Sequence, residues 1–108
     1  MNMDEYQHLA YQTAKYPRSM LIVYPALGMA GECGEVCNKV KKIYRDDNGL
    51  LSPGRKAMIE EEMGAVMWYL AALATDLGVK LGDVAWSNIK ILQGREKRGT
   101  ISGDGDQR

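Results

Sequence analysis

Apolar residues recur at intervals of three and four along most of the chain, which is the period of amphipathic helices. We predict four helices, over residues 3–16, 24–45, 53–77 and 81–96. The segments between them are short and rich in turn residues, as in DDNGLLSPG. No segment alternates apolar and polar residues as strands do. The pattern therefore predicts an all-α fold, a four-helix bundle-like domain with a flexible C-terminal tail.

Local signals mark the helix ends. The residue before Pro17 is disfavoured in helical geometry, so the first helix is predicted to stop there. Ser52 and Pro53 are the residue types preferred at a helix cap and at the first helical position. Two apolar stripes are expected to face the core. They consist of Val36, Val40 and Ile43 in the second helix and Ile59, Val66, Leu70, Leu73 and Leu77 in the third.

Length and charge limit the classes of function. The 108 residues fit one domain spanning 1–108, with a loop-like tail over about 98–108. Fourteen basic residues balance fourteen acidic ones, so no overall field favours nucleic acid or an anionic membrane. No apolar run is long enough to span a membrane, and we expect a cytoplasmic protein. Cys33 and Cys37 lack the CxxC spacing and are predicted to be buried small residues.

The segment IEEEMGAVMWYL, residues 59–70, places three glutamates beside an apolar run. On a helical wheel, Glu62 borders the apolar stripe, whereas Glu60 points toward solvent. If the second and third helices pack antiparallel, Glu32 and Glu35 face Glu62 across the groove between them. Three converging carboxylates need a cation to offset their repulsion, and oxygen ligands favour Mg²⁺ or Mn²⁺.

A simpler interpretation makes these glutamates a solvated face with pairs such as Glu35–Lys39. Gly31 and Gly34 argue against it, since each glycine within a helix costs about 1 kcal/mol relative to alanine. Close approach by a neighbouring helix or by a ligand would explain both glycines.

The segments LGMAGECGEVCNKVKK and EEEMGAVMWYLAALATDLGVKL together resemble the MazG-like all-α nucleoside triphosphate pyrophosphohydrolases. That family has an ExxE motif on one helix and an ExxD motif on the next. Its fourth helix carries an asparagine and arginines. The resemblance covers residues 24–108 and implies that Glu32, Glu35 and Glu62 are catalytic and bind Mg²⁺ or Mn²⁺. The implied reaction splits the α–β phosphoanhydride: (d)NTP + H₂O gives (d)NMP and diphosphate. A purine nucleotide such as dGTP is one candidate substrate.

The resemblance also implies substrate-binding residues and two departures from the family pattern. Asn88 and Arg95 match the asparagine and arginine of the fourth helix, and Arg98 matches the tail of part of the family. Lys39, one turn past Glu35, is placed to contact phosphate oxygens and is equally suited to a surface ion pair. Ala65 stands at the position of the ExxD aspartate, which is a metal ligand in the family. Ile91 replaces a usual lysine. Asp76 cannot substitute for the missing acid, because it lies about 21 Å further along the helix axis than Glu62.

Alternatives therefore remain open. Ala65 is compatible with natural drift, a weakened metal site or an inactivating change, which makes a catalytically inactive nucleotide-binding or regulatory homologue the second hypothesis. A helical interaction module is the third. Trp68, Tyr69 and Trp86 suit core packing or base stacking. The short chain, its methionines and its two tryptophans predict a core completed in a homo-oligomer, and the resemblance implies a dimer or tetramer.

Overall fold

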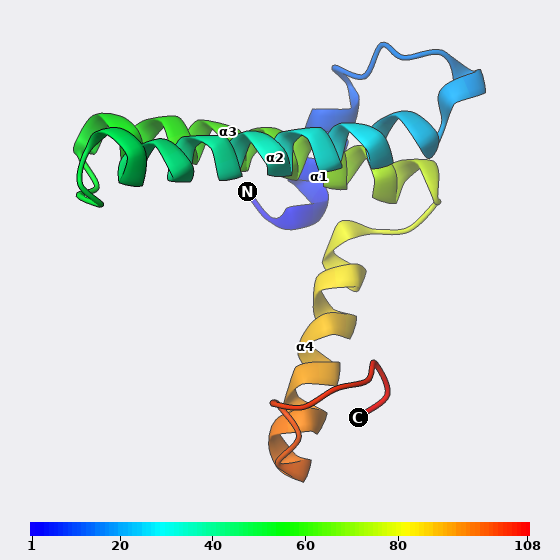
Figure 1. The fold of residues 1–108 in the computed structure, drawn as a ribbon. Helices are drawn as coiled ribbons and strands as arrows, with labels where there is room; N and C mark the ends of the chain where they lie inside the picture. The colour runs from blue at the N-terminus through cyan, green and yellow to red at the C-terminus, as the bar shows by residue number, and fades with distance from the viewer.

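The computed structural model describes all 108 residues and contains helices but no strands (Figure 1). The helices are α1 (Met3–Tyr11), α2 (Val23–Asp46), α3 (Pro53–Asp76) and α4 (Leu81–Arg98), with a short 3₁₀ turn, η1 (Arg18–Met20), before α2. The predicted all-α class and the four helices are confirmed. No single helix is long and apolar enough to cross a membrane. Only α3 and α4 taken together pass that test of length and composition, and they are bent by 101° at their junction.

The central unit is an antiparallel pair formed by α2 and α3, with α1 packed across the C-terminal half of α3 (Figure 1). The predicted start of α3 is confirmed, because the Ser52 hydroxyl accepts a hydrogen bond from the Arg55 amide at 3.1 Å. The Arg55 guanidinium also donates to Asp47 at 2.8 Å, across the turn between the helices. This contact fixes the end of the hairpin, which allows carboxylates on α2 and α3 to face one another.

Helix α1 ends at Tyr11, so the prediction that it reaches residue 16 is wrong. The Ala10 carbonyl is engaged by the hydroxyl of Thr13 at 2.7 Å and by the indole N–H of Trp68 at 3.1 Å. These bonds replace the one that a continuing helix would make to Ala14, whose amide donates to Tyr11 instead. Tertiary contacts, rather than Pro17, therefore stop this helix.

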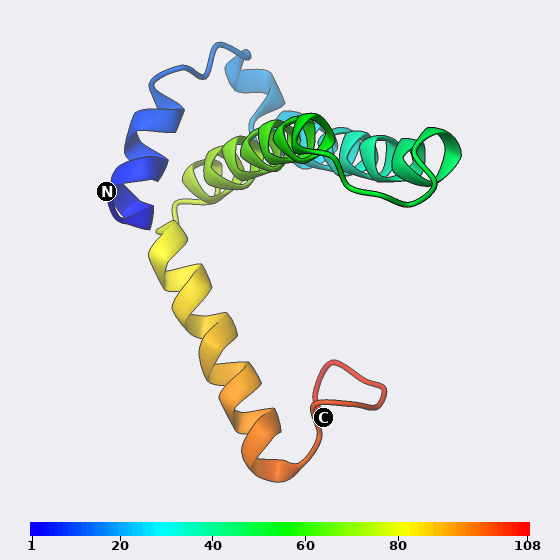
Figure 2. The ribbon, with the colours of Figure 1, turned by 90° about the vertical axis from the view of Figure 1, so that its left-hand side faces the viewer.

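Helix α4 leaves the other helices at the α3–α4 bend and projects away from them (Figure 2). Its first amides are capped by α1: the Leu81 N–H donates to Gln7 at 2.7 Å, and the Gly82 N–H donates to Asp4 at 2.8 Å. Beyond its contacts with α1 and the end of α3, α4 packs against no other helix of the chain. A bundle closed by all four helices is thus not formed by one copy.

The core of the single chain is small. Eight residues are buried, and the main cluster is Ala10, Ala71, Ala74 and Leu81. The predicted leucine stripe of α3 is only partly correct, because Leu70 and Leu77 are 37% and 55% exposed. Alanines fill the contact instead, and their size allows α1 to approach α3 closely.

The remaining core predictions concern α2 and the tail. Ile43 is buried, but Val40 is exposed, and the prediction that Cys33 and Cys37 are buried is wrong. Both thiols are exposed because α3 is the main helix that packs against α2. After α4, the tail carries neither helix nor strand and folds back along the helix, with the Arg108 guanidinium donating to tail carbonyls (Figure 2).

Candidate functional site

Two carboxyl groups meet across the α2–α3 groove. The pKa of Glu62 is raised above its ordinary value, first by a hydrogen bond with the Glu32 side chain, then by burial and the negative charge of Glu32. Lys39 opposes this shift, with its Nζ 3.9 Å from a Glu62 oxygen. The predicted facing of Glu32 and Glu62 is therefore observed. We call these two residues the acid pair.

The orientation predicted for the glutamates of α3 is also observed. The Glu62 side chain is 20% exposed, whereas that of Glu60 is 61% exposed and pairs with Lys56 on the surface. Lys39 pairs with Glu62 rather than with Glu35, so the simple i, i+4 pair is absent. Glu35 is exposed and acts on Glu62 only through its charge.

The acid pair fits a hard cation that is shared with a ligand. No three histidine, cysteine, aspartate or glutamate side chains lie close enough together to form a metal cage. Mg²⁺, however, is commonly held by one or two carboxylates together with substrate phosphates. The two facing carboxyls supply that donor set, and part of the rise in the pKa of Glu62 comes from the negative charge of Glu32, which a cation would offset.

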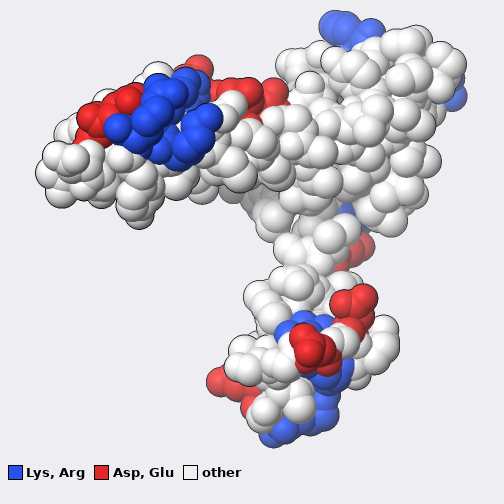
Figure 3. Space-filling view, viewed as in Figure 1, with Lys and Arg blue, Asp and Glu red and all other residues white.

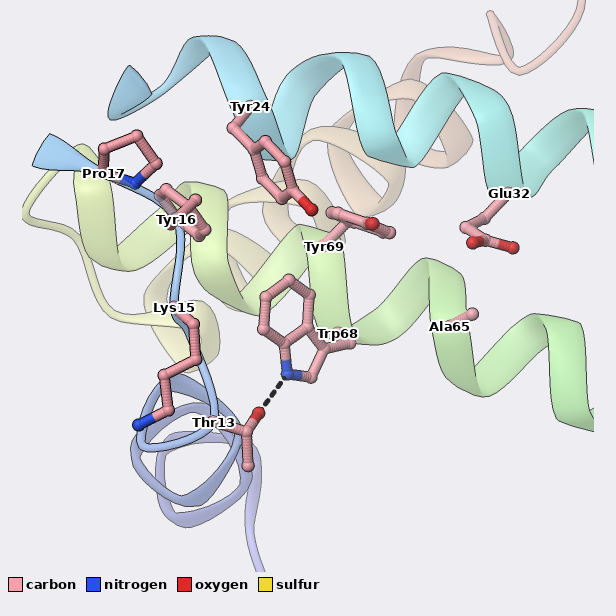
Figure 4. A pocket seen from close by; sticks show the side chains of 9 residues that line it. All are labelled: Thr13, Lys15, Tyr16, Pro17, Tyr24, Glu32, Ala65, Trp68 and Tyr69. Carbon is pink, nitrogen blue, oxygen red and sulfur yellow. Dashed lines mark hydrogen bonds between the residues drawn. The ribbon is translucent and has the colours of Figure 1, made fainter. Parts of the chain in front are cut away.

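A cleft of about 580 Å³ runs from Glu32 of the acid pair toward α1 (Figure 4). Glu32 and Ala65 lie at one end of it, and aromatic side chains lie at the other. Its wall comprises Thr13, Lys15, Tyr16, Pro17, Tyr24, Glu32, Ala65, Trp68 and Tyr69. The cleft thus joins an acidic end to a flat apolar end in one continuous space.

The aromatic end is built from three segments of the chain. Tyr16, after α1, stacks on Tyr24 of α2 with ring centroids 4.7 Å apart and planes 18° from parallel. Trp68 and Tyr69 of α3 meet edge to face at 5.0 Å. The Trp68 indole also donates to the Thr13 hydroxyl at 2.7 Å, which ties the segment after α1 to α3.

Gly28 makes room for this wall. A Cβ at Gly28 would overlap the ring of Tyr69, so α2 approaches that aromatic side chain as only glycine permits. At Gly31 and Gly34, by contrast, an added Cβ would meet nothing within 4 Å. Close approach by a helix of the same chain therefore does not explain Gly31 and Gly34. The prediction that a neighbouring helix approaches them closely is wrong for the single chain.

Sequence reasoning identified Trp68 and Tyr69 as possible stacking residues but missed the other half of the wall. Tyr16, Pro17 and Tyr24 carried one weak signal, a concentration of aromatic and proline residues between two helices. Trp86 does not belong to the cleft, because it is 55% exposed on α4 with the Lys90 ammonium 5.4 Å from its ring centroid.

The predicted residues of α4 are not gathered at the acid pair. Asn88 is exposed, Arg95 donates to the Asp106 carbonyl at 2.8 Å, and Arg98 donates to the Arg108 carbonyl at 2.8 Å. These contacts hold the tail to α4, and the tail lies apart from the α2–α3 pair (Figure 2). Ala65, in contrast, lies in the cleft wall with its methyl group on the side of Glu32 (Figure 4).

Comparison with known proteins agrees with this arrangement. Residues 25–100 match the MazG nucleotide pyrophosphohydrolase domain family. The chain is 42% identical to the Gene 37 protein of Mycobacterium phage L5, over the full length of both proteins. No solved structure matches the chain significantly. With its all-α fold, its acid pair and its match over most of its length, the chain belongs to the MazG nucleotide pyrophosphohydrolase family.

Proposed function

We propose that the protein hydrolyses nucleoside triphosphates to nucleoside monophosphates and diphosphate. The observation that carries this proposal is that one continuous cleft joins two kinds of surface. Stacked aromatic rings lie at one end, and Glu32, paired with Glu62, lies at the other. A nucleotide has the same polarity, with a flat base at one end and a triphosphate that binds cations at the other. The base would lie against the aromatic wall, and the phosphates would lie over the acid pair.

The dimensions support a ligand of this class. A volume of about 580 Å³ lies within the range of roughly 300–1,000 Å³ typical of small-molecule sites. Stacking of a base on an aromatic side chain contributes about 1–3 kcal/mol. We propose a purine such as that of dGTP, because a two-ring base covers more of the wall formed by Tyr16, Tyr24 and Trp68.

We propose Mg²⁺ or Mn²⁺ as the cofactor, held by Glu32 and Glu62 together with the phosphates, with Glu35 adding negative charge nearby. Such a cation, when bound, neutralises phosphate charge and lowers the pKa of water. The acid pair can also take up a proton, since Glu62 already holds one more tightly than an ordinary carboxyl. Lys39, beside Glu62, would exchange its ion pair for phosphate oxygens when the nucleotide arrives.

Ala65 qualifies the proposed activity. Its methyl group lies in the cleft wall where the family has a carboxylate, so one ligand is missing from the place where phosphates and cation would meet. We propose that the chain binds nucleotides but turns them over slowly, since small misplacements of reacting groups lower rates about 100-fold. The same observation favours a second candidate function, that of a nucleotide-binding homologue without hydrolytic activity.

We further propose that a homo-oligomer, a dimer or tetramer, completes the site. The radius of gyration is 16.9 Å, whereas a compact domain of about 100 residues has roughly 13 Å. Most charged side chains in Figure 3 gather at the α2–α3 hairpin and the far part of α4, with a broad uncharged surface between them. A second copy packed on that surface would bury the exposed apolar residues of α4. It would also bring Asn88, Arg95 and Arg98 of one copy toward the cleft of the other.

Nucleotide titration with product analysis tests the proposed function. Adding dGTP and Mg²⁺ together should change Trp68 fluorescence in a Trp86→Phe background, with weaker binding when EDTA replaces Mg²⁺. Product analysis should then find nucleoside monophosphate and inorganic diphosphate in equal amounts. Nucleotide binding that does not depend on Mg²⁺ would contradict the proposal. Release of nucleoside diphosphate and inorganic phosphate would contradict it as well. Binding without any product would favour the second candidate.

A further inference from the structure

One carboxylate at the end of α3 receives three hydrogen bonds from a segment far away in the sequence. Asp76 Oδ1 accepts from the hydroxyl of Tyr11 at 2.6 Å. Asp76 Oδ2 accepts from the hydroxyl of Tyr16 and from the amide of Ile22, both at 2.8 Å. Asp76 thus binds the segment between α1 and α2 at its beginning, middle and end.

The last of these bonds is made at a strained residue. Ile22 has φ 70° and ψ −52°, and the Val23 amide donates across it to the Leu21 carbonyl at 2.7 Å. This is a γ-turn of the rare positive-φ form, which a β-branched side chain disfavours by about 1–3 kcal/mol. A turn of this kind persists only where its surroundings fix it, and the Asp76 bond to the Ile22 amide does so.

The middle bond reaches the wall of the cleft. The ring of Tyr16 stacks on Tyr24, and both line the aromatic end. Asp76 itself does not line the cleft, and it makes no ion pair. Its influence on a ligand would therefore pass through the position of Tyr16.

Electrostatics favour this arrangement. Burial raises the pKa of Asp76, but the Ile22 amide and the two tyrosine hydroxyls outweigh it, and the pKa lies below its ordinary value. The pKa of Tyr16 is raised by burial and by its bond to Asp76. At neutral pH, Asp76 is therefore ionised and both phenols are protonated. Each contact is then a charge-assisted hydrogen bond, the stronger kind.

We propose that Asp76 is a positioning residue for the nucleoside end of the cleft. By binding Tyr16 and the turn at Ile22 together, its carboxylate sets where the aromatic wall stands relative to Trp68. This role rests on the proposed function, because it assigns the aromatic end to the base. It adds a determinant of nucleoside affinity that lies outside the cleft and touches neither ligand nor cation.

The test compares Asp76→Asn with the parent chain and with Asp83→Asn, an exposed acid of α4 that serves as the matched control. Two ligands are titrated in Mg²⁺: dGTP, and inorganic triphosphate, which has the phosphates but no base. Asp76→Asn places an amide N–H₂ among three donors, so we expect about tenfold weaker dGTP binding with triphosphate binding unchanged. Asp76→Glu, which restores the charge, should recover part of the dGTP affinity.

Hydrogen exchange gives a readout independent of nucleotide. Amides of residues 16–23 should exchange faster in Asp76→Asn, while those of the α2–α3 pair keep their protection. If Asp76→Asn does not fold, Tyr16→Phe replaces it, with Tyr11→Phe as its control. Removing the Tyr16 hydroxyl should weaken dGTP binding, and removing the Tyr11 hydroxyl should weaken it less.

Three outcomes would overturn the inference: unchanged dGTP affinity in Asp76→Asn, equal losses for dGTP and triphosphate, or unchanged exchange of residues 16–23. If the parent chain binds neither ligand, the proposed function fails. The exchange of residues 16–23 then decides on its own whether Asp76 holds the wall.

Discussion

The carboxyl group of Glu62 on α3 faces that of Glu32 on α2, and this contact is the largest of the causes that raise the pKa of Glu62. Two facing carboxyl groups repel each other when both are ionised, so the pKa of one of them rises. At neutral pH the pair therefore favours whatever supplies positive charge, and Lys39 supplies part of it from one side. A divalent cation bound together with phosphate would supply more positive charge. Cation binding would therefore give the two carboxyl groups a role, although their proximity does not stabilise the helix pair.

Glu62→Gln should abolish most of the thermal stabilisation that Mg²⁺ or Mn²⁺ gives the parent chain. A cation at about 100 times its dissociation constant stabilises the folded state by about 2.7 kcal/mol. Glu35→Gln should reduce the shift by less, because Glu35 acts on the pair only through its charge. Differential scanning fluorimetry measures these shifts, with helical circular dichroism as the check on folding. Glu60→Gln, on the same helix but exposed, is the control and should leave the shift intact.

The stability of the metal-free protein should depend on pH through the same residue. Because the pKa of Glu62 in the folded protein lies above its ordinary value of 4.5, the folded state binds this proton more tightly than the unfolded chain does. Its contribution is therefore favourable below pH 4.5 and is lost as pH rises through the folded pKa. In EDTA, Glu62→Gln should melt higher than the parent at pH 7.5, and the difference should shrink at pH 4. A difference in melting temperature that is the same at both pH values would contradict the raised pKa of Glu62.

Much of this arrangement follows from local sequence signals. Ser52 and Pro53 fixed the start of α3 because capping depends on a few neighbouring residues. The inward direction of Glu62 followed from its place beside the apolar run of the same helix. The facing of Glu32 and Glu62 required one further assumption, that adjacent helices joined by a short turn pack antiparallel.

Features that depend on distant contacts were not predictable in this way. The end of α1 is set by Trp68, which binds the Ala10 carbonyl from another helix. Exposure of Cys33 agrees with the position of α4, which does not pack along α2. The aromatic wall depends on Asp76 reaching the segment before α2. At each of these positions, the neighbouring residues in the sequence do not indicate which distant residue makes the contact.

Two glycine substitutions on α2 should have opposite effects on stability. Gly28→Ala places a methyl group against the Tyr69 ring, and overpacking of this kind destabilises by about 1–3 kcal/mol. Gly34→Ala meets nothing and should stabilise the chain by up to about 1 kcal/mol through helix propensity. Urea denaturation of both variants measures the free energies of unfolding. A destabilised Gly34→Ala would show instead that a second copy or a ligand occupies that face.

Mixed oligomers test whether α4 of one copy serves the cleft of another. Co-expressed Glu62→Gln and Arg95→Ala chains, each also carrying Ala65→Asp to raise turnover, should regain activity that neither shows alone. In a twofold dimer formed at random, about a quarter of the sites would receive both intact residues. Diphosphate release by the mixture, compared with each chain by itself, measures this recovery. Absence of recovery, or sedimentation of the parent as a monomer at micromolar concentration, would mean that the site is not shared.

The most direct measurement of the central claim is diphosphate release from a panel of (d)NTPs by the parent chain and by Ala65→Asp, each with and without Mg²⁺. Position 65 lines the cleft beside Glu32 and lies one turn from Glu62 on α3. A carboxylate there adds a third oxygen donor where phosphates and cation would meet. We expect Ala65→Asp to release diphosphate about 100-fold faster than the parent, only when Mg²⁺ is present. An Ala65→Asp chain that binds dGTP with Mg²⁺ but releases diphosphate no faster than the parent would contradict the account.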